Sequence, residues 1–336
     1  MPHLVFGAGS IGTTTEGFTY TWDTPEKVAA LLAELHALGI TTLDSAAGYP
    51  PGNAWNTETL LGASGVLGKD NKFVVDTKVL VTPGEAWLAP ALIQASLDKS
   101  LSLLRVPRVR MLYAHANDGK TPLVEQAAVF DREVRAGRCL QYGISNYTTA
   151  DMAALFAICE QHNFVKPAVY QGMYNALRRN IEEELLPLLR KHRCAFYAYS
   201  PLAGGFLTGK VTKAREEAEK GAKEGGELIR TRWQGASAYP AYVKIYDTPA
   251  MHVAVRRLQA VCAAARPPMT TQEASMRWLL HHSALGENDG VIFGAKTVEQ
   301  IRSNVAEMRR GPLPEEVRVV VDGLFATAKS QKRGKL

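Results

Sequence analysis

Three apolar, β-branched stretches of the chain each end in a residue that can carry a proton, and a tyrosine follows the first of them. The carboxyl ends of the strands in a parallel α/β barrel meet at one face, which is where active sites form. An acid, a phenol, an amine and an imidazole gathered there indicate a proton-transfer site. The four residues are Asp44 after residues 40–43, Tyr49 five positions later, Lys78 after 73–77 and His115 after 109–114.

These four groups suit the protonation of a carbonyl oxygen. A tyrosine has an ordinary pKa of about 10, and a nearby ammonium such as that of Lys78 stabilises its phenolate. Asp44 can hold Lys78 charged and oriented while Tyr49 gives a proton to a developing alkoxide. His115 can donate a hydrogen bond to the same oxygen. When the carbonyl oxygen is protonated, the carbonyl carbon must also receive a group. A hydride from a nicotinamide cofactor is the expected one.

Helix-like segments alternate with strand-like segments over most of the chain. Thr24, Pro25 and Gly39 are the N-cap, first-turn and C′ signals of a helix that precedes one of these strands. Such alternation indicates a parallel sheet, and eight strand candidates favour a closed (β/α)8 barrel, or TIM barrel, over an open doubly wound sheet. Strands are expected at residues 4–8, 40–43, 73–77, 109–114, 139–144, 168–171, 195–199 and 291–293.

The helices between these strands carry recognisable start signals. Thr148 with Asp151 is a shortened capping box, and Thr270 with Glu273 is a full one. These pairs place helix starts after two of the expected strands. Helices are expected over residues 25–38, 89–104, 122–136 and 179–191, from 148 onward, and from 271 through 278.

The regular alternation is interrupted between residues 211 and 250, where the chain is first polar and then aromatic. Long loops in compact domains are often functional, so we expect a long lid loop over the barrel mouth in the C-terminal half. Because α/β barrels commonly take this much chain as one domain, residues 1–328 are interpreted as a single barrel domain. Residues 329–336 are interpreted as a basic, disordered tail.

Composition argues against several classes of function. The 336 residues are 46% hydrophobic and 21% charged, which is ordinary for a globular enzyme. No apolar run reaches the roughly 18 residues of a transmembrane helix, and no signal peptide is indicated, so we expect a cytoplasmic protein without a membrane partner. The net charge of +6 is scattered rather than focused, which argues against nucleic acid. The four cysteines form no CxxC pair, and neither a disulfide framework nor a metal-ligand cluster is expected.

Six motifs, in order at the ends of successive strands, give the chain a resemblance to a known family. The sequence resembles the aldo-keto reductases, and most of all their aflatoxin-aldehyde reductase branch, from Phe6 to about Asn304. One motif alone is unspecific, whereas six in order are specific. They are Asp44 with Tyr49, Thr77-Lys78, Tyr113-Ala114-His115, GISNY at 143–147, YQGMYN at 170–175 and YAYSPLAGGFLTGK at 197–210.

The resemblance implies a role for each matching residue. Tyr49 would be the general acid, and Lys78, supported by Asp44, would make its proton easier to release. Asp44 would also lie near the nicotinamide ribose. His115 would orient the carbonyl, and Tyr199 would stack on the nicotinamide ring. Ser145, Asn146 and Gln171 would bind the carboxamide, and Ser200, Pro201, Leu202, Gly204, Gly205, Leu207 and Lys210 would wrap the pyrophosphate.

A second anion-binding segment is implied after the last strand. Residues Gly294 to Thr297 lead into the start of a helix, where backbone N–H groups favour an anion. Lys296 would contact a 2′-phosphate, and Gln300 and Asn304 would face the adenine one helical turn apart. The implied cofactor is therefore NADPH, or NADP+ in the reverse direction, in preference to NADH.

Segments expected around the mouth indicate the kind of substrate. Relatives that reduce an aldehyde bearing a carboxylate place arginines shortly after a lid tyrosine, whereas Tyr242 here is followed by Val243-Lys244-Ile245. The loop at 50–57 is also longer than in relatives. Trp22, Trp55 and Trp233 lie in loops that can reach the mouth, which indicates a larger, apolar or aromatic carbonyl substrate.

Two other functions fit the same residues. Lys78 can form a Schiff base, as lysines do in aldolase-like barrels, with Tyr49 and Asp44 as proton shuttles. A non-catalytic NADPH-binding regulatory subunit, like the β-subunits of potassium channels in the same superfamily, is the third reading, and the intact set of four groups disfavours it. The leading hypothesis is an NADPH-dependent reductase of a small-molecule carbonyl compound. The sequence leaves the substrate, the product stereochemistry, the direction and the oligomeric state open.

Overall fold

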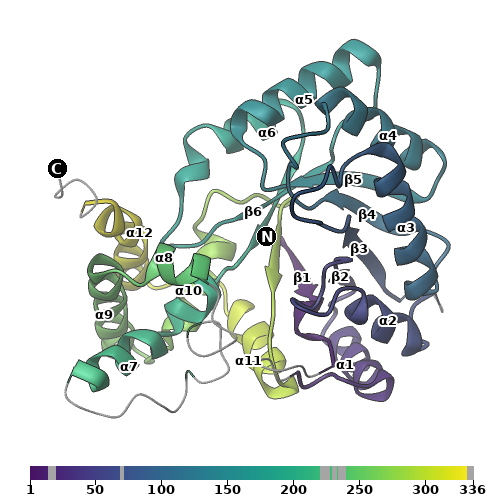
Figure 1. The fold of residues 1–336 in the computed structure, drawn as a ribbon. Coiled ribbons are helices and arrows are strands. Elements are labelled where there is room, and N and C mark those ends of the chain that lie inside the picture. The colour runs from purple at the N-terminus through teal and green to yellow at the C-terminus, as the bar shows by residue number, and fades with distance from the viewer. Residues whose placement is uncertain (14–19, 69–71, 220–227, 229–232, 234–239, 331–336) are drawn as a thin grey trace.

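Eight parallel strands close into a barrel in sequence order, which confirms the predicted fold (Figure 1). The computed structural model describes residues 1–13, 20–68, 72–219, 228, 233 and 240–330. The strands are β1 (His3–Gly7), β2 (Thr42–Asp44), β3 (Val74–Lys78), β4 (Val109–Ala114), β5 (Cys139–Ser145), β6 (Val169–Met173), β7 (Ala195–Tyr199) and β8 (Gly290–Phe293).

The strand register brings polar residues of different strands to one rim of the barrel. Asp44, the last residue of β2, is level with Asp76 of β3, and Lys78 at the end of β3 is level with Tyr113 of β4. Ser145 at the end of β5 pairs with Gln171 of β6. Because all strands are parallel, these carboxyl ends face the same side, as the sequence predicts.

The predicted helix starts are present, but the predicted capping box at residue 270 is only half formed. The Thr270 side chain accepts from the N–H of Glu273, whereas the Glu273 carboxylate pairs with Arg277 and Arg310. The side chain of Thr24 accepts a hydrogen bond from the N–H of Lys27 at the start of α1 (Pro25–Ala37), and Gly39 has a left-handed φ of 72° just after its end. Thr148 and Asp151 form a complete capping box at α5. The outer layer continues with α2 (Asn56–Ala63), α3 (Pro90–Leu104), α4 (Leu123–Arg135), α5 (Thr149–His162), α10 (Thr271–His281) and α11 (Val298–Met308).

One predicted helix is divided in two. Residues 179–191 form a 3-10 turn, η2 (Asn180–Glu182), and a separate helix, α6 (Leu185–Lys191). Pro187 lacks a backbone N–H and is tolerated only in the first turn of a helix. The α-helix therefore starts two residues before Pro187 instead of continuing from residue 179.

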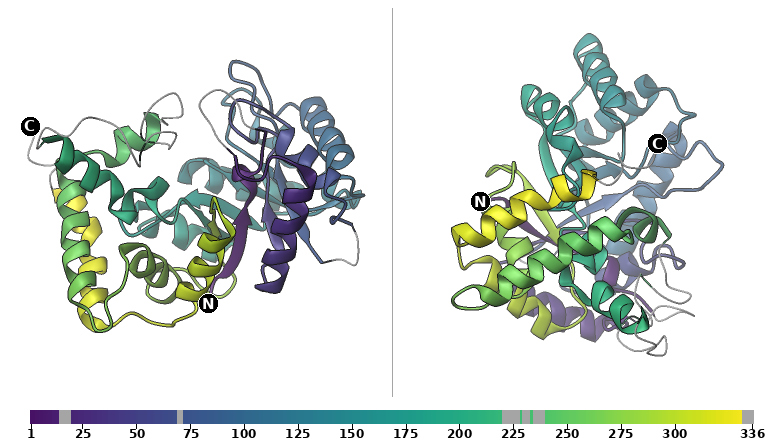
Figure 2. Two further views of the ribbon diagram at one scale, coloured as in Figure 1. Left: turned by 90° about the horizontal axis from the view of Figure 1, so that it is seen from below. Right: turned by 90° about the vertical axis from the view of Figure 1, so that its left-hand side faces the viewer.

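The described part of the interrupted segment contains helices α7 (Lys210–Glu219) and α8 (Pro240–Tyr246), and α9 (Pro249–Ala264) follows it. Most of the expected lid between α7 and α8 lies outside the described residues. Helices α9 and α12 (Glu315–Ser330) pack side by side on one flank of the barrel (Figure 2). The expected tail boundary is corrected, because α12 runs through Ser330 and Lys329 pairs with Glu183 at 2.8 Å. Residues 331–336 lie outside the described residues.

Two hydrophobic layers hold the barrel together. The larger one lies between strands and helices, where α1 buries Val28, Leu31, Leu32 and Leu35 at helical spacing. A smaller cluster fills the barrel interior and is formed by Val5, Met111, Tyr113, Val169, Tyr197 and Ile292. None of the described helices is long and apolar enough to cross a membrane.

Candidate active site

The carboxyl rim of the barrel carries a buried ion pair. Lys78 Nζ donates hydrogen bonds to both carboxylate oxygens of Asp44, at 2.8 and 2.7 Å, and to the carbonyl oxygen of Ser45 at 2.8 Å. Burial is the largest single effect and acts to lower the pKa of Lys78, but the charge and hydrogen bonds of Asp44, together with Tyr49 and Asp76, outweigh it and the pKa is raised. Lys78 is therefore a fixed positive charge in a dry site.

Tyr49 stands next to this charge, on the loop that follows β2. Lys78 Nζ lies 4.9 Å from the centre of the Tyr49 ring. Gly12 makes room for this loop, since a Cβ there would lie only 2.5 Å from Pro50, whereas a Cβ at Gly9 would make an ordinary contact of 3.5 Å with the Tyr49 ring. The loop is closed by the N–H of Thr57, which donates to the carbonyl oxygen of Tyr49 at 3.2 Å.

His115, which follows β4, completes the predicted group of four. Its ring lies edge-on to the Tyr49 ring, with 5.9 Å between the ring centres. Burial, with a smaller effect of the charge on Lys78, lowers the pKa of His115 to about 3. The imidazole is therefore neutral near pH 7. Its buried Nδ1 has no hydrogen-bond partner among the described residues.

The residues expected to bind a carboxamide lie beside this group. Asn146 has a left-handed φ of 59°, and its Nδ2 donates to the carbonyl oxygen of His115 and to Ser145 Oγ, both at 3.0 Å. Its Oδ1 accepts from the hydroxyl of Tyr199 at 2.8 Å. Gln171 Nε2 donates to Asp44 Oδ1 at 2.7 Å. The Gln171 amide is thus bonded directly to the ion pair, whereas the Asn146 amide is bonded to His115, Ser145 and Tyr199.

The glycine-rich segment after β7 has a backbone suited to an anion. Gly204 and Gly205 have left-handed φ values of 68° and 97° within the 3-10 helix η3 (Ala203–Thr208), and Gly209 follows with 81°. At Gly205 an added Cβ would meet only Trp233 Nε1, at 3.9 Å. Open backbone of this kind admits a phosphate closely. Ser200, Pro201, Leu202, Leu207 and Lys210 belong to the same segment, so it fits a diphosphate group.

The second anion-binding segment starts α11. Thr297 caps this helix and accepts a hydrogen bond from the N–H of Gln300 at 3.2 Å. The backbone N–H of Lys296, whose side chain is exposed, donates to Gln300 Oε1 at 2.8 Å. Nothing but a carbonyl oxygen of Gly7, at 4.0 Å, would meet a Cβ at Gly294. Asn304 is buried, and its Oδ1 already accepts from Gln272 at 2.6 Å.

The three predicted substrate tryptophans have other surroundings than expected. Trp22 is 3% exposed and packs edge-on against Phe6 in the hydrophobic core, so it is a core residue rather than part of a loop at the mouth. Trp55 is turned toward α3, where Lys99 Nζ lies 4.4 Å from its ring centre. Trp233 Nε1 donates to the carbonyl oxygen of Gly204 at 2.9 Å, within the glycine-rich segment.

A fourth tryptophan, which sequence reasoning missed, reaches the rim. Trp87 lies in the loop after β3, and its Nε1 donates to the carbonyl oxygen of Ala116 at 3.3 Å, one residue after His115. Trp87 lies in a long loop after the strand that ends in Lys78, and this position in the sequence could have predicted that it lies near the rim. The lid also reaches the site, since Tyr242 and Ser200 share a hydrogen bond of 2.5 Å between their hydroxyls.

Two buried carboxylates near Lys78 were also missed. Asp76, inside the barrel, forms a two-pronged ion pair with Arg110, whose Nε lies 2.8 Å from Asp76 Oδ1. Burial raises the pKa of Asp76 to about 6 in spite of this partner. Glu58, outside the barrel, accepts from Thr77 at 2.5 Å and from Ser100 at 3.0 Å, and burial raises its pKa to about 7. Charged residues inside apolar strands, such as Asp76 and Arg110, are signals that sequence analysis can use.

The fold is a (β/α)8 barrel with a group of ionisable side chains at the carboxyl ends of its strands. Residues 3–324 match the model of the aldo/keto reductase family. The chain belongs to the aldo/keto reductase family, and the protein is an oxidoreductase that acts on carbonyl or alcohol groups. Members of this family generally use nicotinamide cofactors.

Individual relatives cover nearly the whole chain. The human aldo-keto reductase family 7 member A3 is 35% identical over 321 residues, which cover 94% of this chain and 91% of the relative. The human aflatoxin B1 aldehyde reductase member 2 is 36% identical over 300 residues, covering 88% of this chain and 80% of the relative. The aldo-keto reductase pigE of Monascus ruber is 30% identical over 342 residues, covering 97% and 95%.

Proposed function

We propose that this protein reduces an aldehyde or ketone to an alcohol, with hydride from NADPH and a proton from Tyr49. The observation that carries the proposal is the buried Lys78–Asp44 pair beside Tyr49, with Lys78 Nζ 4.9 Å from the phenol ring centre. A fixed ammonium close to a phenol favours the phenolate and so eases proton release. In a dry site this effect is larger than in water.

The other members of the group act on the carbonyl oxygen. The neutral imidazole of His115 donates one N–H to this oxygen and orients it toward the hydroxyl of Tyr49. As the oxygen becomes an alkoxide, Tyr49 donates its proton, and the resulting phenolate is stabilised by Lys78. Asp44 keeps Lys78 charged and in place throughout. No group in this sequence of events needs to change its position.

The residues present fit a bound NADPH molecule, which supplies a hydride when bound. Ser145, Asn146 and Gln171 would bind its carboxamide, and the ring of Tyr199 would lie against the nicotinamide. The open backbone at Gly205 would hold the diphosphate, next to Gly204, which the Tyr242 ring covers. At the other end, Lys296 would contact the 2′-phosphate, with Gln300 and Asn304 toward the adenine.

The substrate class follows from the mouth of the site. Four relatives are named as aflatoxin B1 aldehyde reductases. No arginine follows Tyr242, so recognition of a short carboxylate-bearing aldehyde has no evident partner in this part of the lid. Trp87, next to His115, offers an aromatic face. We therefore favour a bulky, apolar or aromatic carbonyl substrate.

The test is to titrate the purified protein with NADPH and with NADH by fluorescence, and then to add 4-nitrobenzaldehyde. We expect tight NADPH binding and loss of the reduced-nicotinamide absorbance. Tight binding without turnover on a panel of aromatic aldehydes favours the regulatory subunit. No binding, together with trapping of substrate on Lys78 by borohydride, favours Schiff-base chemistry and contradicts the reductase.

The preference for NADPH has its own test. Lys296→Met removes the cation proposed for the 2′-phosphate, and we expect NADPH affinity to fall about fivefold, in line with a partly exposed charge pair. NADH affinity should not change, because NADH lacks this phosphate. Lys27→Met, at an exposed lysine of α1, is the control and should leave both affinities unaltered.

A further inference from the structure

A cavity of about 410 Å³ opens at the face of the barrel opposite to Tyr49, where the strands begin. Its volume lies in the range of small-molecule sites. His3 at the start of β1, Thr42 at the start of β2 and Arg110 near the start of β4 all line it. Nothing in the proposed reductase mechanism uses this cavity, which we name the floor cavity.

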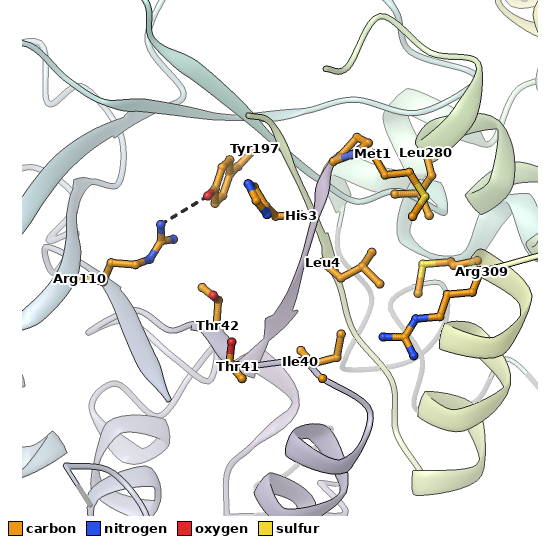
Figure 3. Close-up of a pocket in the computed structure, with 13 residues that line it drawn as sticks. Met1, His3, Leu4, Ile40, Thr41, Thr42, Arg110, Tyr197, Leu280 and Arg309 are labelled. Atoms are coloured by element: carbon orange, nitrogen blue, oxygen red, sulfur yellow. Dashed lines mark hydrogen bonds between the residues drawn. The ribbon is translucent and has the colours of Figure 1, made fainter. Parts of the chain in front are cut away.

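Apolar side chains, cations and hydrogen-bond donors line the floor cavity, and no carboxylate of the described residues is among them. In Figure 3, Arg110, Tyr197 and His3 point toward one another on one side of β1. Arg309 lies on the other side of the strand, near Leu4 and Leu280. A concave site with positive charge on its walls attracts anions.

Arg110 is held in place from inside the barrel. Its guanidinium forms an ion pair with Asp76, and Asp76 interacts electrostatically with Lys78. Charges of alternating sign therefore occupy the barrel interior from the active site to the floor cavity. The series Asp44, Lys78, Asp76 and Arg110 ends in a cation whose side chain is 19% exposed. A bound anion in the floor cavity would lie next to the positive charge of Arg110 and would extend this series by one negative charge.

Several donors at the floor cavity are not yet used. The hydroxyl oxygen of Tyr197 accepts from Arg110 Nη1 at 3.4 Å, but the hydroxyl hydrogen has no acceptor among the described residues. Arg309 donates from Nη2 to the carbonyl oxygen of Leu38 at 2.6 Å. In the part of the chain that the structure describes, no carboxylate lies within ion-pair distance of Arg309.

We propose that the floor cavity is a binding site for a small organic carboxylate. The carboxylate group is recognised by the hydroxyl of Tyr197, by Nη1 of Arg110 and, at longer range, by the positive charge of Arg309. Asp76 already binds Nε and Nη2 of Arg110, so Arg110 contributes Nη1, the nitrogen that faces Tyr197. The apolar body of the ligand rests on Leu4, Ile40 and Leu280, which line the same cavity.

The test uses the full chain without cofactor, with benzoate as the probe and benzyl alcohol as its neutral counterpart. Isothermal titration should show saturable benzoate binding and markedly weaker binding of the alcohol. Arg309→Gln should weaken benzoate binding about fivefold, the effect of one partly screened charge pair. Arg302→Gln on α11, the helix that ends just before Arg309, should leave benzoate binding unchanged, because Arg302 pairs with Glu34 and does not line the cavity.

Tyr197→Phe is the second variant, since it removes only a hydroxyl and keeps the packing of the ring. It should also weaken benzoate binding severalfold. Benzoate can enter the active site too, but binding there does not respond to Arg309 or Tyr197. Benzoate affinity that is equal in wild type, Arg309→Gln and Tyr197→Phe overturns the proposal. So does equal binding of benzyl alcohol, or no benzoate binding up to about 10 mM, beyond the range of specific small-ligand sites.

Discussion

Lys78 donates hydrogen bonds to both carboxylate oxygens of Asp44, and the two side chains are 0% and 4% exposed. An ion pair of this kind is stable only when both charges are present, because either charge alone would be buried without a partner. The pair therefore holds a permanent positive charge beside Tyr49. The first prediction concerns what happens when one partner is removed.

Lys78→Met should lower both activity and stability. Loss of the cation removes the group that favours the phenolate of Tyr49, so kcat should fall by about 10² to 10⁴. Asp44 is left buried and unpaired, which should lower the free energy of unfolding by about 3–5 kcal/mol. Turnover assays and urea denaturation measure the two effects.

The double variant Asp44→Asn with Lys78→Met separates stability from chemistry. It removes the unpaired charge, so about half or more of the lost stability should return, as for other buried pairs replaced together. Activity should stay as low as in Lys78→Met. A double variant that is no more stable than Lys78→Met contradicts the view that the two charges are coupled.

His115 should stay neutral throughout the physiological range. Burial, assisted by the charge on Lys78, lowers its pKa to about 3. The imidazole of His115 therefore does not take up a proton at the pH values at which an exposed histidine does. The ring chemical shifts of His115, measured by NMR, should be constant between about pH 5 and 8. A titration of His115 near 6.5 would show that it is not desolvated as described.

Glu58 should make stability depend on pH. Its pKa in the folded protein is about 7, above the ordinary value of 4.5. Between these values the unfolded chain releases a proton that the folded chain keeps, so the free energy of unfolding falls as the pH rises from about 4.5 to 7. Glu58→Gln lacks this ionisation. Its free energy of unfolding, relative to that of wild type, should therefore increase by at most about 3 kcal/mol as the pH rises over that window.

Chemical denaturation of both proteins at several pH values measures this difference. The hydrogen bonds with Thr77 and Ser100 change in the variant at every pH, so the pH-dependent part isolates the ionisation. Parallel stability curves for the two proteins would mean that Glu58 ionises normally in the fold.

Trp233 should control how fast the cofactor leaves. Its Nε1 donates to the carbonyl oxygen of Gly204, and the centre of its ring lies 5.4 Å from the centre of the Phe206 ring. Gly204 and Phe206 both belong to the glycine-rich segment. Trp233→Phe keeps an aromatic ring but loses the hydrogen bond, worth about 1 kcal/mol, so NADPH dissociation in stopped-flow should become about fivefold faster. Trp55→Phe, on the side of α3, should leave the rate unchanged, and equal rates in all three proteins would contradict this role.

The sequence predicts the barrel well because two strong signals agree. Periodic apolar segments alternate regularly, and ionisable residues such as Lys78 and His115 follow strand after strand. The parallel register then brings those residues to one rim without further information. The start of α1 can be predicted equally well, because Thr24 and Pro25 act through contacts with residues close to them in the sequence.

The side-chain surroundings could not be predicted in the same way. Trp22 and Trp55 belong to loops in the sequence, but their burial depends on Phe6 and on Lys99 of α3, far along the chain. The pairing of Asp76 with Arg110 joins residues 34 positions apart. Such contacts follow from the closed barrel, and a single sequence without the fold does not contain them.

The most direct measurement of the central claim is a single-turnover comparison of wild type and Tyr49→Phe, each saturated with NADPH and mixed with 4-nitrobenzaldehyde. The variant removes one hydroxyl and leaves the Lys78–Asp44 pair in place. We predict equal NADPH affinity and a cofactor oxidation rate at least about 100-fold lower in the variant, the usual contribution of a general acid. Oxidation at the wild-type rate in Tyr49→Phe would contradict the account, because another group would then supply the proton.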